Sequence, residues 1–207
     1  MLVGELSHRV KNMLAVVQSI AFQTARHSPS LDAFSNAFQG RLQALATAND
    51  AIIRGNWKGV RLHEIVERAL DPFGAGDQVT IAQGPAIDLR PQASLALAMI
   101  LHELATNAVK YGALSVPAGK VGIGWKAQAA GSGDELVMEW TERSGPAIVA
   151  PLRKGQGTRF IKGSIAHELK GKATLNFEPS GLSATLSFPL TAAVLGDDSP
   201  LDDSLSD

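Results

Sequence analysis

Residues 101–112 read Leu-His-Glu-Leu-Ala-Thr-Asn-Ala-Val-Lys-Tyr-Gly. They predict the last turns of a helix that begins near Pro91, because proline suits the first turn of a helix. Nearly every residue in the range 93–101 is apolar, so we expect this helix to lie in the core of the protein. Gly112 is expected to end the helix as a C-terminal cap.

Three polar side chains interrupt this apolar helix on one face. Glu103, Asn107 and Lys110 follow one another at spacings of four and three residues, which align side chains along a helix. A carboxylate, an amide and an ammonium group on a buried helix need polar partners or a ligand. The pattern therefore indicates a face that binds a metal–nucleotide complex.

The composition is that of an ordinary globular protein. The 207 residues carry a net charge of −1, and 45% of them are apolar, which allows one or two domains with a sizeable core. With no global charge field, no nucleic acid or acidic membrane is expected as a partner. There is no apolar run long enough to cross a bilayer, no signal-peptide pattern and no cysteine. A cytoplasmic location is the simplest interpretation.

Residues 1–57 predict an antiparallel helical hairpin. The first helix carries a heptad-like seam, formed by Leu6, Val10, Met13, Val17, Ile20 and Thr24. Ser28-Pro29-Ser30 should break this helix. A second helix should follow over residues 31–53, with a buried side formed by Leu31, Phe34, Phe38, Leu42, Leu45, Asn49 and Ile52. Because a lone hairpin would expose its apolar stripe, we expect two copies to form a four-helix bundle.

His8 points away from the predicted seam, with Arg9 and Lys11 beside it. It is either a solvated helix histidine or an exposed imidazole that acts as a nucleophile, since imidazole is neutral for much of the time near neutral pH. Asn12 lies one turn further along the same exposed face. A position opposite the seam would let both a donor and an acceptor domain reach His8.

Residues 58–194 predict an α+β sandwich. Helical patterns cover residues 62–70, 91–111 and 157–169. Strand patterns cover residues 79–82, 86–89, 120–127, 135–141, 173–178 and 182–188. This order would place the polar helix face, the loop at 140–145 and the turn at 155–158 around one cleft. The acidic, serine-rich residues 195–207 are expected to be disordered.

Four motifs occur in a fixed order along the chain. They are His8-Arg9-Val10-Lys11-Asn12, the stretch from His102 to Gly112, Trp140-Thr141-Glu142-Arg143-Ser144-Gly145-Pro146 and Gly155-Gln156-Gly157-Thr158-Arg159. Together they closely resemble the HWE branch of sensor histidine kinases, which is named for the histidine of the second motif and the Trp-x-Glu of the third. The resemblance covers about residues 5–190. It implies a dimerisation and phosphoacceptor hairpin followed by an ATP-binding α/β sandwich of the GHKL, or Bergerat, type.

The resemblance also implies roles for residues that match the motifs of the hairpin and the core helix. His8 would be the phosphoacceptor, and Asn12 would orient a water in the reverse phosphatase step. Asn107 would ligate Mg²⁺, and Glu103 would position the metal, its water or the accepting imidazole. Lys110 would neutralise phosphate charge.

The remaining matches imply a binding site for ATP. Tyr111 would line the nucleotide pocket, and Glu142 stands where related ATPases use an aspartate to accept a hydrogen bond from the adenine amino group. Gly145 would keep the adjacent backbone close to the base. Gly155 and Gly157 would let backbone N–H groups approach the phosphates at a helix N-terminus.

Some positions are ambiguous or depart from the family pattern. Thr158 either belongs to the phosphate site or only caps the helix that follows. Trp140 is interpreted as a core residue. Ser144 stands where many relatives have glycine, Gln156 stands where an apolar or aromatic residue is common, and Asn49 replaces a residue that is often histidine.

The activity implied by the resemblance is autophosphorylation of His8 by Mg²⁺–ATP, followed by transfer to an aspartate in the receiver domain of a response regulator. The expected assembly is a homodimer. No sensor domain precedes Met1, so the chain is expected to be truncated or controlled by another protein. The alternatives are a phosphotransfer or adaptor protein with a degenerate, non-catalytic ATPase-like domain, and a structural scaffold, which leaves the cleft motifs unexplained.

Overall fold

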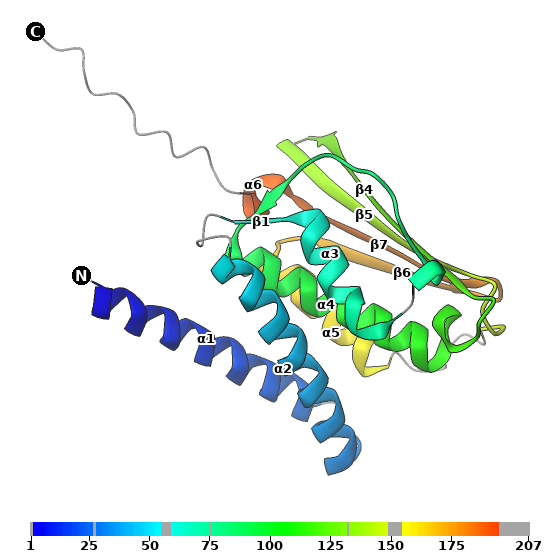
Figure 1. Cartoon of the computed structure of the whole chain (residues 1–207), viewed down its shortest axis with the longest axis horizontal. Helices are drawn as coiled ribbons and strands as arrows, with labels where there is room; N and C mark the ends of the chain where they lie inside the picture. The colour runs from blue at the N-terminus through cyan, green and yellow to red at the C-terminus, as the bar shows by residue number, and fades with distance from the viewer. Residues whose placement is uncertain are drawn as a thin grey trace, which may run out of the picture.

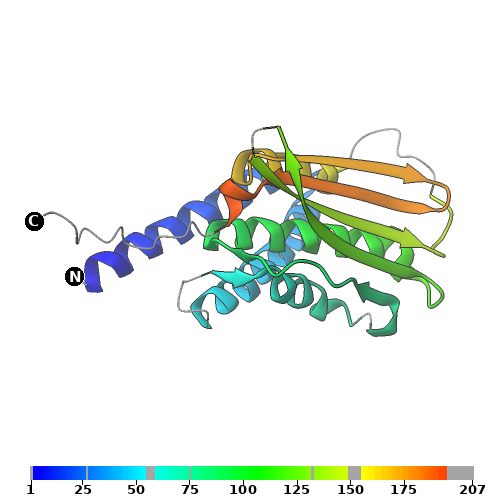
Figure 2. The ribbon, with the colours of Figure 1, turned by 90° about the horizontal axis from the view of Figure 1, so that it is seen from above.

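The computed structural model describes residues 2–26, 28–54, 59–74, 76–131, 133–148 and 155–194, without the side chains of residues 2–9, 12 and 156. Its elements form three parts, which are a helical hairpin, a middle group of helices and a sheet (Figures 1 and 2). The middle helices lie between the hairpin and the sheet. This arrangement confirms the predicted α+β class.

The hairpin consists of α1, Leu2–Ala25, and α2, Leu31–Arg54. Ser30 accounts for the start of α2, because its hydroxyl accepts a hydrogen bond from the backbone N–H of Ala33 at 3.2 Å. The two helices diverge from their connecting turn, and α2 packs along α3 and α4 (Figure 1). The predicted antiparallel hairpin is therefore present, with α2 docked on the rest of the fold.

The buried side of α2 differs in part from its prediction. It is formed by Arg41, Ala44, Leu45, Ala48, Ala51 and Ile52. Leu31 is 80% exposed, so its predicted burial is wrong; it is the first residue of α2, at the turn end of the hairpin. Asn49 is partly buried, and its Oδ1 has no hydrogen-bond partner within the described part of the chain.

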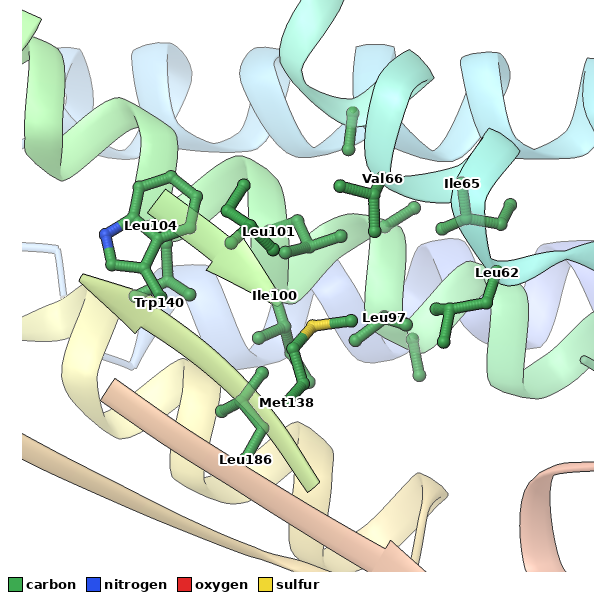
Figure 3. Close-up of a cluster of buried hydrophobic side chains, with 14 of the residues drawn as sticks. Leu62, Ile65, Val66, Leu97, Ile100, Leu101, Leu104, Met138, Trp140 and Leu186 are labelled. Carbon is green, nitrogen blue, oxygen red and sulfur yellow. The ribbon is translucent and has the colours of Figure 1, made fainter. Parts of the chain in front are cut away.

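The middle group contains α3, Leu62–Leu70, α4, Pro91–Tyr111, and α5, Gln156–Glu168. Helix α4 has the predicted bounds and is buried through most of its first four turns. Figure 3 shows its apolar side chains between α3 and the sheet: Leu97, Ile100, Leu101 and Leu104 of α4, with Leu62, Ile65 and Val66 on one side and Met138, Trp140 and Leu186 on the other. Each such buried leucine or isoleucine stabilises the fold by about 1.5–3 kcal/mol.

A smaller apolar cluster joins the hairpin to the middle helices. Its buried members are Ile20 of α1, Ala44 and Leu45 of α2, Met99 of α4 and Phe160 of α5. Because Ala48, Ala51 and Ile52 of α2 also belong to the main core, the hairpin shares buried surface with the sandwich. The division of the chain at residues 57 and 58 stays a prediction, and both residues lie outside the described ranges.

The main sheet has five strands in the order β2-β4-β5-β7-β6. The strands are β2, Val79–Ile81, β4, Lys120–Ala130, β5, Gly133–Arg143, β6, Lys172–Glu178, and β7, Gly181–Pro189. Only the β2–β4 pair is parallel among these described strands, and the others are antiparallel. Burial alternates along β7, as expected for a sheet with one face against the helices.

Short elements complete the fold. They are β1, Val60–Arg61, paired with β3, Asp88–Leu89, the 3₁₀ turns η1, Asp71–Phe73, η2, Gly76–Gln78, and η3, Ala113–Ser115, and α6, Leu190–Ala193. The predicted strand at 86–89 is thus shorter than expected, and the strands at 120–127 and 135–141 are longer. Residues 195–207, predicted to be disordered, lie outside the described residues.

Among the described helices, none combines the length and the apolar character that crossing a bilayer requires.

Candidate functional site

The polar face of α4 runs from the core to the surface. Glu103 is 9% exposed, Asn107 is half-buried and Lys110 is exposed. The spacing of these residues therefore aligns them as predicted, with the carboxylate deepest and the ammonium group outermost. A ligand that reached all three would have its charged end partly shielded from water, which strengthens electrostatic interactions.

The start of α5 lies directly against this face. A Cβ atom placed on Gly157 would lie 3.0 Å from Asn107 Nδ2 and 3.1 Å from Glu103 Oε2. The predicted meeting of the helix face with the glycine turn is therefore confirmed, and a side chain at Gly157 would crowd it. A Cβ on Gly155, the N-cap of α5, would meet no described atom within 4 Å, so crowding explains only the second glycine.

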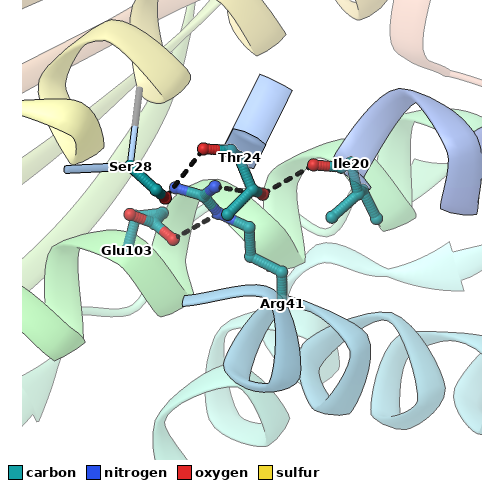
Figure 4. A network of polar contacts seen from close by, with 5 residues as sticks. All are labelled: Ile20, Thr24, Ser28, Arg41 and Glu103. Carbon is teal, nitrogen blue, oxygen red and sulfur yellow. Dashed lines mark hydrogen bonds and ion pairs between the residues drawn. The ribbon is translucent and has the colours of Figure 1, made fainter. Parts of the chain in front are cut away.

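Glu103 has a charged partner that sequence analysis did not identify. Arg41 Nε donates a hydrogen bond to Glu103 Oε1 at 2.8 Å, and the two side chains are 3% and 11% exposed (Figure 4). Arg41 belongs to none of the four motifs. The available signal was its spacing, since it lies three residues after Phe38 and four before Leu45, on the buried stripe of α2.

Glu142 lies at the end of β5 and is 4% exposed. The backbone N–H of Ala113 donates to its Oε2 at 2.8 Å, and Trp140 Nε1 donates to its Oε1 at 3.1 Å. Burial raises the pKa of Glu142, and these two hydrogen bonds act in the opposite direction. The carboxylate thus ties β5 to the turn that follows α4, and its role toward adenine stays a prediction.

Gly112 is required by space. It ends α4 by donating its N–H to the carbonyls of Ala108 and Asn107, but its φ of −115° and ψ of −152° are extended. Gly112 is therefore the C-cap of α4, as predicted, although its backbone is not in the left-handed conformation usual for a glycine cap. A Cβ on Gly112 would collide with the carboxylate of Glu142, which explains the glycine in another way.

Gly145 is also required by close packing, in this case against the turn that follows α4. A Cβ there would lie 2.8 Å from Ala113 Cα and 3.2 Å from the carbonyl carbon of Gly112. The loop after β5 therefore lies directly on the backbone that follows α4. Gly145 is therefore needed for close packing against η3, and its predicted approach to a base stays a prediction.

Ser144 adopts a backbone conformation that favours glycine. Its φ is 55°, in the left-handed region, which matches its position where relatives often carry glycine.

The Ser144→Gly variant is expected to be more stable by about 1 kcal/mol. A residue with a Cβ in the left-handed conformation costs roughly 1–2 kcal/mol, and glycine removes this cost. Part of the gain is lost because glycine also increases the conformational entropy of the unfolded chain. Thermal unfolding followed by circular dichroism measures the change. Lys170→Gly is the matched control, since Lys170 also has a φ of 55° but lies after α5. A lower melting temperature for Ser144→Gly, with a higher one for Lys170→Gly, would contradict this explanation.

His102 lies beside the site in a packing role. Its ring contacts the ring of Phe73 at a centroid distance of 5.2 Å, in a tilted arrangement. Burial lowers the pKa of His102, Glu103 opposes this effect, and Arg41 and Lys110 lower the pKa further. Burial is the largest of these effects, so the net change lowers the pKa of His102.

Other predicted residues have mixed outcomes. Trp140 is 1% exposed, which confirms its place in the core. Thr158 is buried and makes no cap hydrogen bond to α5, whose N-cap is Gly155, so the capping alternative is wrong. Tyr111 is 72% exposed, and its contact with a nucleotide stays a prediction.

The hairpin motif lies near the N-terminal end of α1. The side chains of His8 and Asn12 are outside the described part of the structure. The N-terminal end of α1 extends beyond the folded body, while its C-terminal end meets the other helices (Figures 1 and 2). One chain in this arrangement therefore does not bring that end of α1 next to the polar face of α4.

The residues of this face fit a shared metal ion. The amide oxygen of Asn107 and the carboxylate of Glu103 are hard donors of the kind that Mg²⁺ prefers. Within the described ranges, no group of three or more His, Cys, Asp or Glu residues could hold a metal. Two oxygen donors suit a metal whose other ligands are water and phosphate.

A helical hairpin followed by an α+β sandwich, with the polar face of its core helix against a glycine turn, is the arrangement expected from the resemblance to histidine kinases. Residues 5–86 match the model of the HWE histidine kinase family, which confirms the resemblance to that family. The chain is 40% identical over 205 residues to a blue-light-activated histidine kinase of Brucella anthropi, covering 98% of the chain and 41% of the relative. The Brucella ovis blue-light-activated histidine kinase is 38% identical over 191 residues, which cover 92% of this chain and 39% of that relative. The chain thus spans about two fifths of the length of these relatives.

Solved structures agree with this fold class. The histidine kinase domain of the Erythrobacter litoralis blue-light activated histidine kinase has a TM-score of 0.56 at 15% identity, covering 87% of this chain and 95% of that domain. The longer Erythrobacter litoralis blue-light activated histidine kinase has a TM-score of 0.57 at 20% identity, and the match covers 92% of this chain and 59% of that protein's chain. At these identities the likeness supports the fold alone.

Proposed function

We propose that this chain is the kinase region of a two-component sensor protein, which phosphorylates His8 and passes the phosphoryl group to an aspartate of a response regulator. The observation that carries the proposal is the meeting of Glu103 and Asn107 with Gly157, on a fold shared with histidine kinases. The 40% identity to a named histidine kinase supports the same activity.

The proposed reaction assigns separate tasks to the two parts of the chain. Bound Mg²⁺–ATP supplies the γ-phosphoryl group. A nitrogen of His8 forms the new N–P bond as the bond from phosphorus to the ADP oxygen breaks, and the imidazole gives up its proton to solvent. Asn107 would hold the metal, Glu103 would position the reacting groups and Lys110 would neutralise phosphate charge. Catalysis then consists mainly of positioning and charge neutralisation.

The adenine and phosphate contacts belong to the loops around α4. Tyr111, Glu142 and Gly145 would surround the adenine, supported by the contact of Gly145 with the turn after α4. Gly155, Gly157 and Thr158 would approach the phosphates at the start of α5, where backbone N–H groups and the helix dipole favour anions.

The proposed assembly is a homodimer with a receiver domain as its partner. Large apolar side chains are exposed on the hairpin: Val10, Leu14, Phe22, Leu31 and Ile53, each between 49% and 80% exposed. Their burial in a four-helix bundle would remove this surface from water. Because the relatives are more than twice as long as this chain, an associated sensor part is also proposed.

Labelling with γ-³²P ATP and Mg²⁺ tests the proposal. Label that is acid-labile and base-stable is expected in the wild type and absent in His8→Ala, while binding of Mg²⁺–AMP-PNP is unchanged. His63→Ala, on α3, is the control that keeps its label. Retention of the label in His8→Ala would contradict the assignment of the acceptor.

Two further outcomes separate the alternatives. The adaptor protein would be favoured if the dimer binds nucleotide but His8 is not labelled, and if adding the sensor part of a longer relative does not restore the label. An absence of nucleotide binding would overturn the site itself.

A further inference from the structure

Arg41 links four helices at one buried point. It lies on α2, and its Nη1 donates a hydrogen bond to Thr24 Oγ1 of α1 at 2.6 Å (Figure 4). Its Nε donates to Glu103 of α4 at 2.8 Å, and its guanidinium lies 4.2 Å from the centroid of the Phe160 ring of α5. We call Arg41, Thr24, Glu103 and Phe160 the Arg41 junction.

The junction fixes the guanidinium from several directions. The Thr24 hydroxyl donates its own proton to the carbonyl of Ile20 at 2.6 Å, which leaves a lone pair directed at Arg41. The Phe160 ring supports the planar cation from one side, as cation–π geometry requires. Arg41 therefore cannot follow Glu103 into another rotamer without breaking contacts to α1 and α5.

The consequence for Glu103 is a fixed orientation. Arg41 holds Oε1, while Oε2 lies beside Gly157, since a Cβ there would be 3.1 Å from Oε2 and 3.0 Å from Asn107 Nδ2. A carboxylate with one oxygen held has its plane restricted, so the second oxygen keeps its direction into the site. A buried carboxylate without such a partner would be costly, because a buried charge needs a pair.

We propose that Arg41 is a positioning residue for Glu103, and that the site geometry therefore depends on the hairpin being packed against α4 and α5. This inference rests on the proposed function of Glu103. Arg41 belongs to α2 of the hairpin, whereas Glu103 belongs to α4. The hairpin that carries His8 therefore also contributes to the nucleotide site, through a contact that does not involve His8 itself. A purely structural ion pair would stabilise the fold without affecting the reaction selectively.

The first test replaces Arg41 by methionine, which keeps the unbranched aliphatic part of the side chain and removes the charged guanidinium group. At saturating ATP, the initial rate of His8 labelling is expected to fall by about tenfold or more, because misplacement of a positioned group slows the reaction. Affinity for Mg²⁺–AMP-PNP is expected to stay within about threefold of wild type, since the loss concerns the reaction step. Arg41→Lys, which keeps the charge, should recover part of the rate. A wild-type rate in folded Arg41→Met would overturn the proposal.

A double-mutant cycle tests whether Arg41 acts through Glu103. If it does, Arg41→Met combined with Glu103→Gln labels no more slowly than Glu103→Gln alone. Losses that multiply in the double variant would show an independent, structural effect and would overturn the positioning role.

A gentler variant covers the case in which Arg41→Met fails to fold. Thr24→Val removes the acceptor of Arg41 Nη1 with little change in volume, and it should slow labelling without weakening nucleotide binding. Ser94→Ala is the matched control, because Ser94 is also a buried hydroxyl that bonds a carbonyl, on α4 away from the junction. Equal rates for Thr24→Val, Ser94→Ala and wild type would overturn the proposal.

A readout without phosphorylation distinguishes this inference from the proposed function. If the wild type binds Mg²⁺–AMP-PNP but never labels, the kinase proposal fails. The junction is then tested by amide hydrogen exchange: the nucleotide should slow exchange in the turns around Thr24 and Arg41 in wild type and leave Glu103→Gln unchanged. No change in the wild-type hairpin would overturn the coupling.

Discussion

Replacing Gly112 by alanine is expected to lower the free energy of unfolding by about 3 kcal/mol. The new Cβ would occupy the place of the Glu142 carboxylate and would also lie 3.0 Å from Ala108 Cα. Either the carboxylate or the end of α4 must move, and the hydrogen bond from Ala113 to Glu142 is lost. A buried carboxylate with one donor fewer and a shifted helix end both cost stability.

Urea unfolding followed by tryptophan fluorescence measures this loss. Gly163→Ala is the matched control, because a Cβ there meets no described atom within 4 Å and lies inside α5. Alanine in a helix interior should stabilise by about 0.5–1 kcal/mol relative to glycine. The clash also predicts that Gly112→Ala costs less when Glu142 is already alanine. An equal cost in both backgrounds would argue against Glu142 as the reason for the glycine.

The Asn107→Ala variant is expected to lose most of its activity while keeping its fold. Asn107 is half-buried, and the part of the chain that the structure describes gives its amide no hydrogen-bond partner. Its removal should therefore change the free energy of unfolding by less than about 0.5 kcal/mol. If the amide oxygen ligates Mg²⁺, labelling of His8 should fall by about a hundredfold or more.

Binding separates the metal role from a general defect. In the presence of Mg²⁺, Asn107→Ala should bind AMP-PNP about tenfold more weakly than wild type. In the presence of a chelator, the two proteins should bind alike, because the lost ligand matters only when the metal is bound. Asn176→Ala removes an exposed amide from the edge strand β6 and should match wild type in both conditions. Mg²⁺-dependent binding of normal strength in Asn107→Ala would rule out the ligand assignment.

The long elements were predictable because their patterns are local. Helix α4 combines a proline at its first position with a continuous apolar run, and its bounds agree with the prediction. The two-residue strands β1 and β3 are too short to display a period, so β1 was missed and the strand at 86–89 was drawn too long. Their pairing depends on a contact between segments far apart in the chain.

The candidate site was predictable only in part, for the same reason. The Glu103 and Asn107 face and the Gly157 turn were expected to meet because both belong to recognisable motifs. Arg41 was missed because an isolated arginine on a helix is normally exposed, and its burial depends on a partner 62 residues later. For Gly112, the local pattern predicts a helix cap, but the steric requirement for glycine comes from the carboxylate of Glu142, 30 positions further along the chain.

The burial along α1 has a mechanical consequence. Of its described side chains, Ile20 and Thr24 are buried, whereas Val10 and Leu14 are 51% and 56% exposed. The helix of 24 residues, about 36 Å long, is thus held along its C-terminal half, where Met13, Val16 and Val17 also pack against the cluster that contains Ile20, and its N-terminal part projects. A tilt of roughly 10° at Thr24 would move the far end by about 6 Å. The position of His8 in space is therefore set by an angle at its distant anchor, the helix end that contacts Arg41.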